Sequence, residues 1–159
     1  MSKGESTPAV AALLTAGVDH VLHPYTHDPR VASYGREAAE ALDVDPDRVF
    51  KTLMIDLGGT LAVAVVPVSC TLDLKAAAGA LGAKRATMAD PVAAQRATGY
   101  VLGGISPLGQ RRGHRTVIDE TVELWDTVLV SGGRRGLDVE LSAADLIDLT
   151  EGIVAAIAR

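Results

Sequence analysis

Aromatic residues are scarce in this chain, which has one Phe, one Trp and three Tyr among 159 residues. A surface that stacks rows of RNA bases needs an exposed ring for each base, so the scarcity excludes that class of RNA-binding module. A net charge of -5 argues against strong and indiscriminate nucleic-acid binding. The length fits one compact domain, and we expect a single domain over residues 1–159.

Cysteine and long apolar runs are also nearly absent. Cys70 is the only cysteine, so no internal disulfide can form, and a reducing compartment is expected. The N-terminal segment does not follow the pattern of a secretion signal. The strongest apolar run, residues 61–68, contains Pro67 and is far shorter than the roughly 20 residues that cross a bilayer. We therefore expect a soluble, cytoplasmic protein without a membrane partner.

The sequence alternates helix and strand patterns. Helices are predicted from Thr7-Pro8 to Gly17, over residues 33–41 and 72–81, from Asp90-Pro91 to Gly99, and after Ser142. Strands are predicted over residues 18–25, 49–56, 61–68, 115–118, 127–130 and 137–141. Gly58-Gly59 predicts a hairpin between the second and third strands, and Gly132-Gly133 with Gly136 separates the last two. This order predicts an α+β fold in which a mixed sheet curls against helices.

Lys51 stands inside an apolar strand pattern, where a cation must reach water or a partner. An edge-strand lysine that discourages aggregation is one interpretation. The other is a positive charge directed into a cleft, at a phosphate or a carbonyl oxygen.

The segment GGISPLG, residues 103–109, predicts a shaped loop whose backbone amides and carbonyls remain free for a substrate or for a structural turn. Ser106 does not fit a nucleophile elbow, because Pro107 removes an amide and the second glycine comes one position late. Cys70 has no sequence mark of a neighbouring base, so a small buried side chain is the favoured interpretation.

His23 and His27 are four residues apart but lack the glutamate of the HExxH pattern, so no metal site is expected. Asp138 and Glu140 alternate onto one face of their strand, for which a solvated face is the default interpretation. Residues 91–118 contain no Asp or Glu but carry four arginines, including Arg111 and Arg112. Such arginines suit a phosphate-bearing ligand or belong to ordinary solvated loops.

Taken together, the segments VFKTL, VAVVPV, TGYVLGGISPLGQ and VSGGRRGLDVEL resemble the YbaK/EbsC family of aminoacyl-tRNA deacylases, closest to its Cys-tRNA(Pro) branch. The similarity runs from about residue 49 to the C-terminus and more loosely from Tyr25. The resemblance implies a small α+β editing domain with a barrel-like mixed sheet. It also implies catalytic roles for Lys51, Ser131 and Asp138, and substrate contacts from Tyr25, Thr52, Gly103, Gly104, Ile105, Ser106, Arg111 and Arg112.

The activity implied by this resemblance is hydrolysis of mischarged tRNA at its acceptor 3′ end, without a cofactor. In the family's mechanism the thiol of the substrate cysteine attacks its own ester. Two alternatives stay open: a sister deacylase for Ala- or Ser-charged tRNA, and a non-catalytic module that binds tRNA ends or a synthetase. Prolyl-tRNA synthetase is the expected partner, and the sequence leaves the oligomeric state open.

Overall fold

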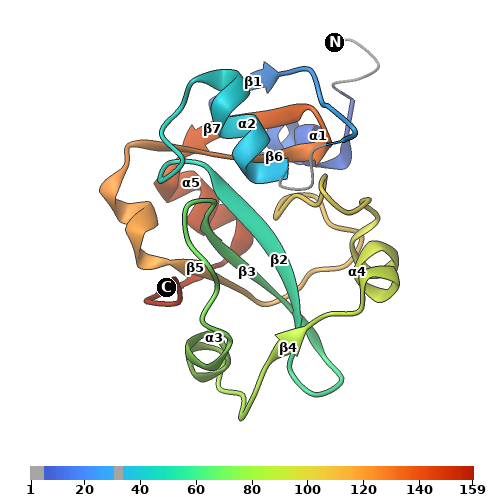
Figure 1. Cartoon of the computed structure of the whole chain (residues 1–159), viewed down its shortest axis with the longest axis vertical. Coiled ribbons are helices and arrows are strands. Elements are labelled where there is room, and N and C mark those ends of the chain that lie inside the picture. The colour runs from blue at the N-terminus through green and yellow to red at the C-terminus, as the bar shows by residue number, and fades with distance from the viewer. Residues whose placement is uncertain (1–5, 31–33) are drawn as a thin grey trace.

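The computed structural model describes residues 6–30 and 34–159. Five α-helices, eight strands and one 3₁₀ helix follow one another along these residues (Figure 1). Their order is α1 (Pro8–Ala16), β1 (His20–Pro24), α2 (Tyr34–Leu42), β2 (Phe50–Asp56), β3 (Leu61–Pro67), α3 (Leu74–Ala80), β4 (Thr87–Met88), α4 (Pro91–Thr98), β5 (Thr116–Asp119), η2 (Glu120–Leu124), β6 (Thr127–Arg134), β7 (Leu137–Ser142), α5 (Ala143–Thr150) and β8 (Ile153–Ala155).

The strands form two sheets that are joined at one point. The smaller sheet has the order β1-β7-β6, and the larger has the order β4-β2-β3-β5-β8. The larger sheet is mixed, because β3 pairs antiparallel with β2 but parallel with β5. A parallel bridge between Val49 and Leu129 connects β2 to β6. The predicted α+β fold with a curled, mixed sheet is confirmed.

The β2–β3 hairpin is the longest pairing in the fold, from Phe50 opposite Pro67 to Asp56 opposite Leu61. In its turn, Asp56 Oδ1 accepts hydrogen bonds from the amides of Gly58 and Gly59 at 2.8 and 2.6 Å. Both glycines have positive φ angles, 99° and 112°, which side chains with a Cβ rarely adopt. The two-glycine hairpin predicted from the sequence is confirmed.

Helix caps fix most of the predicted helix starts. The side chains of Thr7, Asp90 and Ser142 each accept a hydrogen bond from the backbone N–H three residues later, which satisfies a donor that the helix leaves unpaired. Gly17 and Gly99 end α1 and α4 in the left-handed conformation, as the sequence predicts. The predicted cap Ser33 of α2 lies outside the described residues.

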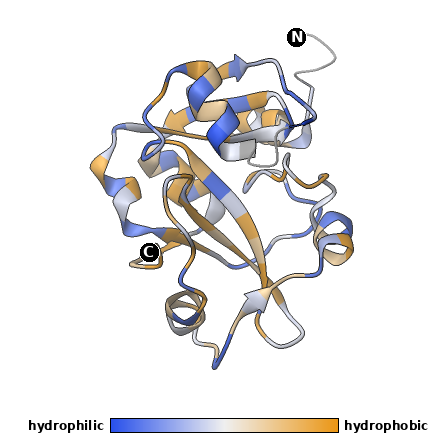
Figure 2. Cartoon of the chain, in the orientation of Figure 1, coloured by the Kyte–Doolittle hydropathy of each residue, from blue (hydrophilic) through white to orange (hydrophobic). Residues whose placement is uncertain are grey.

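The hairpin divides the core because its side chains alternate between two faces. Phe50 and Met54 point into the larger apolar cluster, which includes residues of α1, α5 and the small sheet. Ile55 and the alanines of β3 face a second cluster under α3. Figure 2 shows hydrophobic residues along much of this hairpin. No described helix has the length and hydropathy needed to span a membrane.

The structure corrects the sequence prediction at the glycine pair of β6. The strand does not end at Val130, but continues through Gly132 and Gly133 to Arg134 with a bulge between Ser131 and Arg134. A Cβ on Gly132 would lie 2.7 Å from Leu137 Cγ, so glycine allows the two strands to approach closely here. The sequence prediction also missed β4, β8 and η2, which are too short to carry a periodic pattern.

Candidate active site

A cavity of about 520 Å³ opens between β2, the loop after α4 and the small sheet, a volume within the range of small-ligand sites. It joins segments that are more than 100 residues apart in the sequence. Of the residues that the sequence singled out, Tyr25, Lys51, Thr52, Gly103, Ile105, Ser131 and Asp138 line this cavity.

The edge of β2 that faces away from β3 forms one wall of the cavity. Val49 O accepts a hydrogen bond from Val68 N at 2.8 Å. Because hydrogen-bonded pairs alternate along an antiparallel ladder, the odd-numbered residues of β2 are the ones whose backbone groups bond to β3. The N–H and C=O of Thr52 therefore point away from β3. On the edge of β2 that faces away from β3, no described strand pairs between the Val49 bridge and the Ile55–Met88 pair. This gap in the pairing gives the cavity a strand edge that can hydrogen-bond to a ligand.

The Thr52 hydroxyl is an unusual polar group in this wall. Its Oγ1 is buried and has no hydrogen-bond partner among the residues that the structure describes. A buried hydroxyl without a partner is destabilising compared with one that is paired. Thr52 therefore provides a candidate contact for a bound molecule.

Lys51 lies at the same wall and is partly buried. Burial lowers the pKa of its ammonium group, the nearby Cys70 thiol opposes this shift, and the positive charge of Arg36 adds to the lowering. Within residues 6–30 and 34–159, no carboxylate forms an ion pair with Lys51. A desolvated cation without a counter-ion is suited to an anionic or strongly polarised group of a substrate.

Asp138 stands on β7, the central strand of the small sheet, directly opposite Ser131 of β6 and His23 of β1. Asp138 is only 5% exposed, and burial raises the pKa of its carboxyl group to about 7. No hydrogen bond from another described residue reaches this carboxyl group, which borders the cavity. The carboxyl group can therefore exchange a proton near neutral pH.

The solvated-face interpretation of Asp138 and Glu140 is wrong. Asp138 is buried, and Glu140 is partly buried in a polar network with His23, Arg48 and Thr127. Alternation does place both carboxylates on one face of β7, but α2 and the segment before β2 cover that face. Sequence alternation identifies a shared face, and only packing decides whether that face is wet.

Tyr25 approaches Asp138 from the end of β1. Burial raises the pKa of the Tyr25 hydroxyl to about 12, and the charge of Asp138 contributes to this rise. The backbone N–H of Tyr25 donates to Gly136 O at 2.9 Å, which fixes the residue against the turn between β6 and β7. The phenol therefore stays protonated and is available as a hydrogen-bond donor.

The GGISPLG loop contributes by its backbone shape. Gly103 has a φ angle of 83° and lines the cavity with Ile105. Gly104 is packed against β6, where an added Cβ would lie 2.8 Å from Arg134 Cα. Ser106 is fully buried, and its Oγ accepts from the N–H of Leu108 at 3.2 Å. Gly104 and Ser106 thus shape the loop and do not line the cavity.

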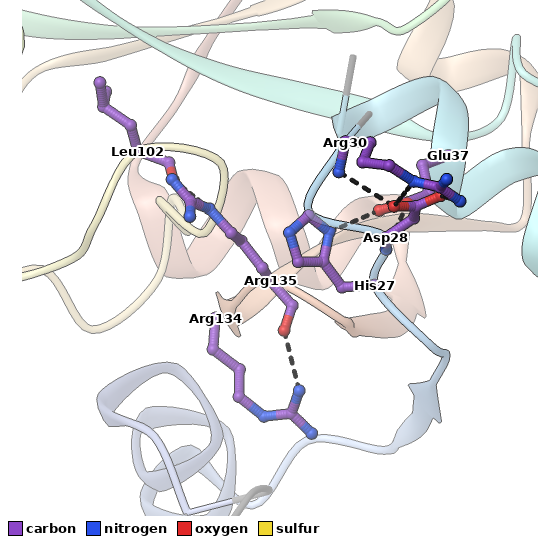
Figure 3. Close-up of polar contacts among 7 residues, drawn as sticks. All are labelled: His27, Asp28, Arg30, Glu37, Leu102, Arg134 and Arg135. Atoms are coloured by element: carbon purple, nitrogen blue, oxygen red, sulfur yellow. Dashed lines mark hydrogen bonds and ion pairs between the residues drawn. The ribbon is translucent and has the colours of Figure 1, made fainter. Parts of the chain in front are cut away.

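Polar contacts join the loops around the mouth of the cavity (Figure 3). Arg135 Nε donates to Leu102 O at 2.8 Å, which ties the β6–β7 turn to the start of the GGISPLG loop. Glu37 of α2 binds His27 Nδ1 and accepts from the backbone N–H of Asp28, both at 2.8 Å. These bonds join two separate pairs of segments near the cavity: the β6–β7 turn with the GGISPLG loop, and α2 with the segment after β1.

Arg111 and Arg112 lie outside the cavity. Arg111 packs against Gly99 at the end of α4, and its Nη1 donates to Arg96 O at 3.4 Å. Arg112 borders a separate recess of about 400 Å³ with His114 and Glu151. Burial and the charge of Arg112 lower the pKa of His114. The structure thus separates these arginines from Lys51 and Asp138.

The other candidate chemistries of the sequence find ordinary structural uses. No group of three metal-ligating side chains occurs among the described residues. His23 and His27 each bind a carboxylate, Glu140 and Glu37. Cys70 is partly buried, with its Sγ 3.7 Å from Ser69 Oγ. Sequence reasoning missed the apolar wall formed by Met88, Ala89, Pro91 and Ala94, for which the sequence carried no signal beyond hydropathy.

Comparison with known proteins assigns the chain. The sequence model of the family described as the aminoacyl-tRNA editing domain matches residues 28–149. The chain belongs to the aminoacyl-tRNA editing domain family. This membership supports the expected class of enzyme, an aminoacyl-tRNA deacylase. A protein of Enterococcus faecalis (strain ATCC 700802 / V583), provisionally named Cys-tRNA(Pro)/Cys-tRNA(Cys) deacylase EbsC, is 36% identical over 116 residues, which are 72% of this chain and 70% of that protein.

Solved structures show the same fold for this editing domain. A provisionally assigned trans-editing enzyme for prolyl tRNA synthetase aligns with a TM-score of 0.82 and 24% identity, covering 100% of this chain and 99% of that one. The hypothetical protein APE2540 aligns with a TM-score of 0.84 and 24% identity, covering 96% and 99%. The described cavity lies within an editing-domain fold.

Proposed function

We propose that this editing domain removes cysteine from mischarged tRNA(Pro). The observation that carries the proposal is a cavity with a cation and a buried acid, in which no hydrogen bond among the described residues activates a nucleophile. Ser131 Oγ accepts from the N–H of Gly133 at 3.2 Å, and no hydrogen bond joins this hydroxyl to the carboxyl group of Asp138. The hydroxyl-bearing residues of the cavity are Tyr25, Thr52 and Ser131, and no histidine or cysteine of the described chain lines it. A serine needs a neighbouring base to attack an ester at neutral pH. The name of the Enterococcus faecalis relative supports cysteine as the amino acid removed.

The substrate itself can supply the nucleophile. The cysteine thiolate attacks its own ester carbonyl, forming a carbon–sulfur bond in a cyclic thioester. The carbonyl–oxygen bond to the terminal ribose breaks, and the ribose oxygen takes up a proton as tRNA leaves. Water then opens the cyclic thioester to free cysteine. An internal nucleophile held in its reactive conformer has a high effective concentration, so the protein has mainly to position and neutralise.

The residues of the cavity have complementary roles in this reaction. Lys51 holds the terminal phosphate or polarises the ester carbonyl, where negative charge develops. Gly103 provides a backbone contact, and Thr52 presents a strand edge to the aminoacyl end. Ser131 and Asp138 orient the aminoacyl group and the terminal ribose, while Tyr25 closes the pocket beside Asp138.

A deacylation panel tests this function. Wild-type protein is incubated with Cys-tRNA(Pro), Ser-tRNA(Pro) and Ala-tRNA(Pro), and the remaining ester is measured. Cleavage of the cysteinyl ester with little cleavage of the other two is expected, because serine and alanine lack the sulfur. Equal rates on all three esters would contradict thiol assistance. Faster cleavage of the alanyl or seryl ester would indicate a sister deacylase, and binding without cleavage would indicate a non-catalytic module.

Prolyl-tRNA synthetase is the proposed partner. The net charge of -5 predicts weak affinity for free tRNA, so a synthetase that holds the tRNA would raise the local substrate concentration. The solved trans-editing relative, which is named for this synthetase, supports the proposal. Addition of the synthetase should lower the KM for mischarged tRNA, and an unchanged KM would contradict the partnership.

A further inference from the structure

The cavity is too small for most of its proposed substrate. A volume of about 520 Å³ suits a single aminoacylated nucleoside, whereas the rest of a tRNA must lie on the outer surface. The phosphates next to the terminal nucleotide must therefore cross the residues around the cavity mouth. This inference rests on the proposed function and asks which surface those phosphates meet.

The β4–α4 wall of the cavity has exposed cations at both of its ends. Met88 and Pro91 line the cavity, Lys84 and Arg85 come just before β4, and Arg96 lies in the last turn of α4. Arg111 is held beside Arg96 by its hydrogen bond to Arg96 O, and Arg112 follows it. We call these five exposed cations the basic rim: Lys84, Arg85, Arg96, Arg111 and Arg112.

The basic rim is not neutralised by the protein. The four ion pairs or histidine–carboxylate contacts among the described residues involve His23, His27, Arg30 and Arg48, and none involves a rim residue. Residues 83–118 carry six Lys or Arg and a single acid, Asp90, whereas the rest of the chain carries nine Lys or Arg and 19 acids. An acidic protein whose cations without an acidic partner are concentrated in the segments on either side of the β4–α4 wall is arranged to attract an anionic partner locally.

Two exposed apolar side chains lie on the same segments as the rim cations. Val92 on α4 is 59% exposed and Val101 in the following loop is 55% exposed. Such side chains offer contact to sugar faces while the arginines and lysines reach phosphate oxygens. The combination fits a nucleic-acid backbone, in which phosphates alternate with sugars along the chain.

We propose that the basic rim binds the phosphate backbone of the tRNA acceptor end and guides its terminal nucleotide into the cavity. The contacts are with phosphate and sugar and read no base sequence. The rim therefore provides affinity and orientation, while the cavity selects the amino acid.

The test compares a large and a small substrate on the same variants. One variant combines Lys84→Gln with Arg85→Gln, and a second carries Arg96→Gln. A control combines Lys75→Gln with Arg159→Gln, which removes two exposed cations outside the rim. The kcat/KM is measured for Cys-tRNA(Pro) and for the cysteinyl ester of adenosine, which cannot reach the rim. Arg96 also lies at a helix C-terminus, so thermal unfolding of each variant is recorded.

The rim variants should lose about tenfold in kcat/KM on the tRNA, remain within about twofold of wild type on the adenosine ester, and match the control in thermal stability. With labelled, uncharged tRNA, the slope of log Kobs against log salt should fall by roughly 1 to 2 for the double variant. Equal losses on both substrates, or the same salt slope in the rim variant and the control, would overturn the proposal.

Failure of the proposed function gives a different result. If wild-type protein cleaves neither ester, the deacylase proposal fails, while the binding of uncharged tRNA still reports on the rim. If wild type cleaves both esters and the rim variants bind and cleave tRNA normally, the rim proposal alone fails. The two outcomes are therefore separable in one set of measurements.

Discussion

Ser131 on β6 and Asp138 on β7 are cross-strand partners, and both side chains border the cavity. The β-bulge begins immediately after Ser131, so β6 keeps its register with β7 up to this pair and loses it beyond. A one-residue slip would move the pair to the opposite face, into the apolar core. Ser131 and Asp138 are therefore the last regular pair before the bulge, and this regular pairing holds both residues at the cavity.

Replacement of Lys51 tests the role of the free cation. Lys51→Met keeps the aliphatic stem but removes the charge, and single-turnover cleavage of Cys-tRNA(Pro) should fall by about 100-fold, as for loss of one group that stabilises developing negative charge. Lys75→Met, an exposed lysine on α3, is the matched control and should cleave normally. Unchanged cleavage by Lys51→Met would remove Lys51 from the site.

The activity should depend on the ionisation of Asp138. The pKa of this carboxyl group is about 7, so its charged form, which can bind the substrate ammonium group, accumulates as the pH rises through this value. We expect kcat/KM to increase across about pH 6 to 8 with an inflection near 7. Asp138→Asn should be slower and should lack that inflection, while any inflection from the substrate thiol persists. A wild-type inflection near 7 that survives in Asp138→Asn would assign it to another group.

Asp138 should also lower the stability of the protein at alkaline pH. Its folded-state pKa of about 7 exceeds the ordinary value of 3.8, so the folded state binds more protons between these two values. The free energy of unfolding of the wild type therefore falls as the pH rises from about 4 to 7. Asp138→Asn should be more stable than wild type by roughly 2 to 4 kcal/mol at pH 8, with most of this gain absent near pH 4. Urea unfolding at the two pH values measures the difference, and an equal gain at both would contradict the assignment.

Gly104 should be required for the loop to approach β6. A Cβ at this position would lie 2.8 Å from Arg134 Cα and 3.0 Å from Arg134 C, atoms of the backbone that cannot turn aside. Gly104→Ala should lower the free energy of unfolding by about 1 to 3 kcal/mol, as overpacking does. Gly79→Ala in α3 meets nothing within 4 Å and should stabilise by about 0.5 to 1 kcal/mol. Thermal unfolding of both variants measures the contrast, and a neutral Gly104→Ala would show that the loop can move.

Signals that span a few residues predicted most of the fold. Thr7-Pro8, Asp90-Pro91 and Ser142 predicted three helix starts, because a cap needs only its own turn of chain. Gly58-Gly59 predicted the hairpin for the same reason. Thr87–Met88 escaped prediction because a two-residue strand exists only where β2 is present to pair with it.

The candidate site was predictable in part. The resemblance carried by the KT, GGISP and SGG motifs predicted seven residues that the structure brings to one cavity, although their catalytic roles stay predictions. It did not separate those seven from Gly104, Ser106, Arg111 and Arg112, because residues adjacent in a loop can face opposite directions. The apolar wall from Met88 to Ala94 was missed, since exposed and cavity-lining apolar residues have the same composition.

The sequence by itself determined the local conformations: the capped helices, the glycine hairpin and the alternation that places Asp138 and Glu140 on one face of β7. Tertiary structure alone decided that this face is covered, that Asp138 is left without a hydrogen-bond partner among the described residues, and that Lys51 and Asp138 line the same cavity. The physical reason is that caps and turns are satisfied within a few residues. Burial, desolvation and the resulting pKa values depend on segments that come together only when the two sheets join.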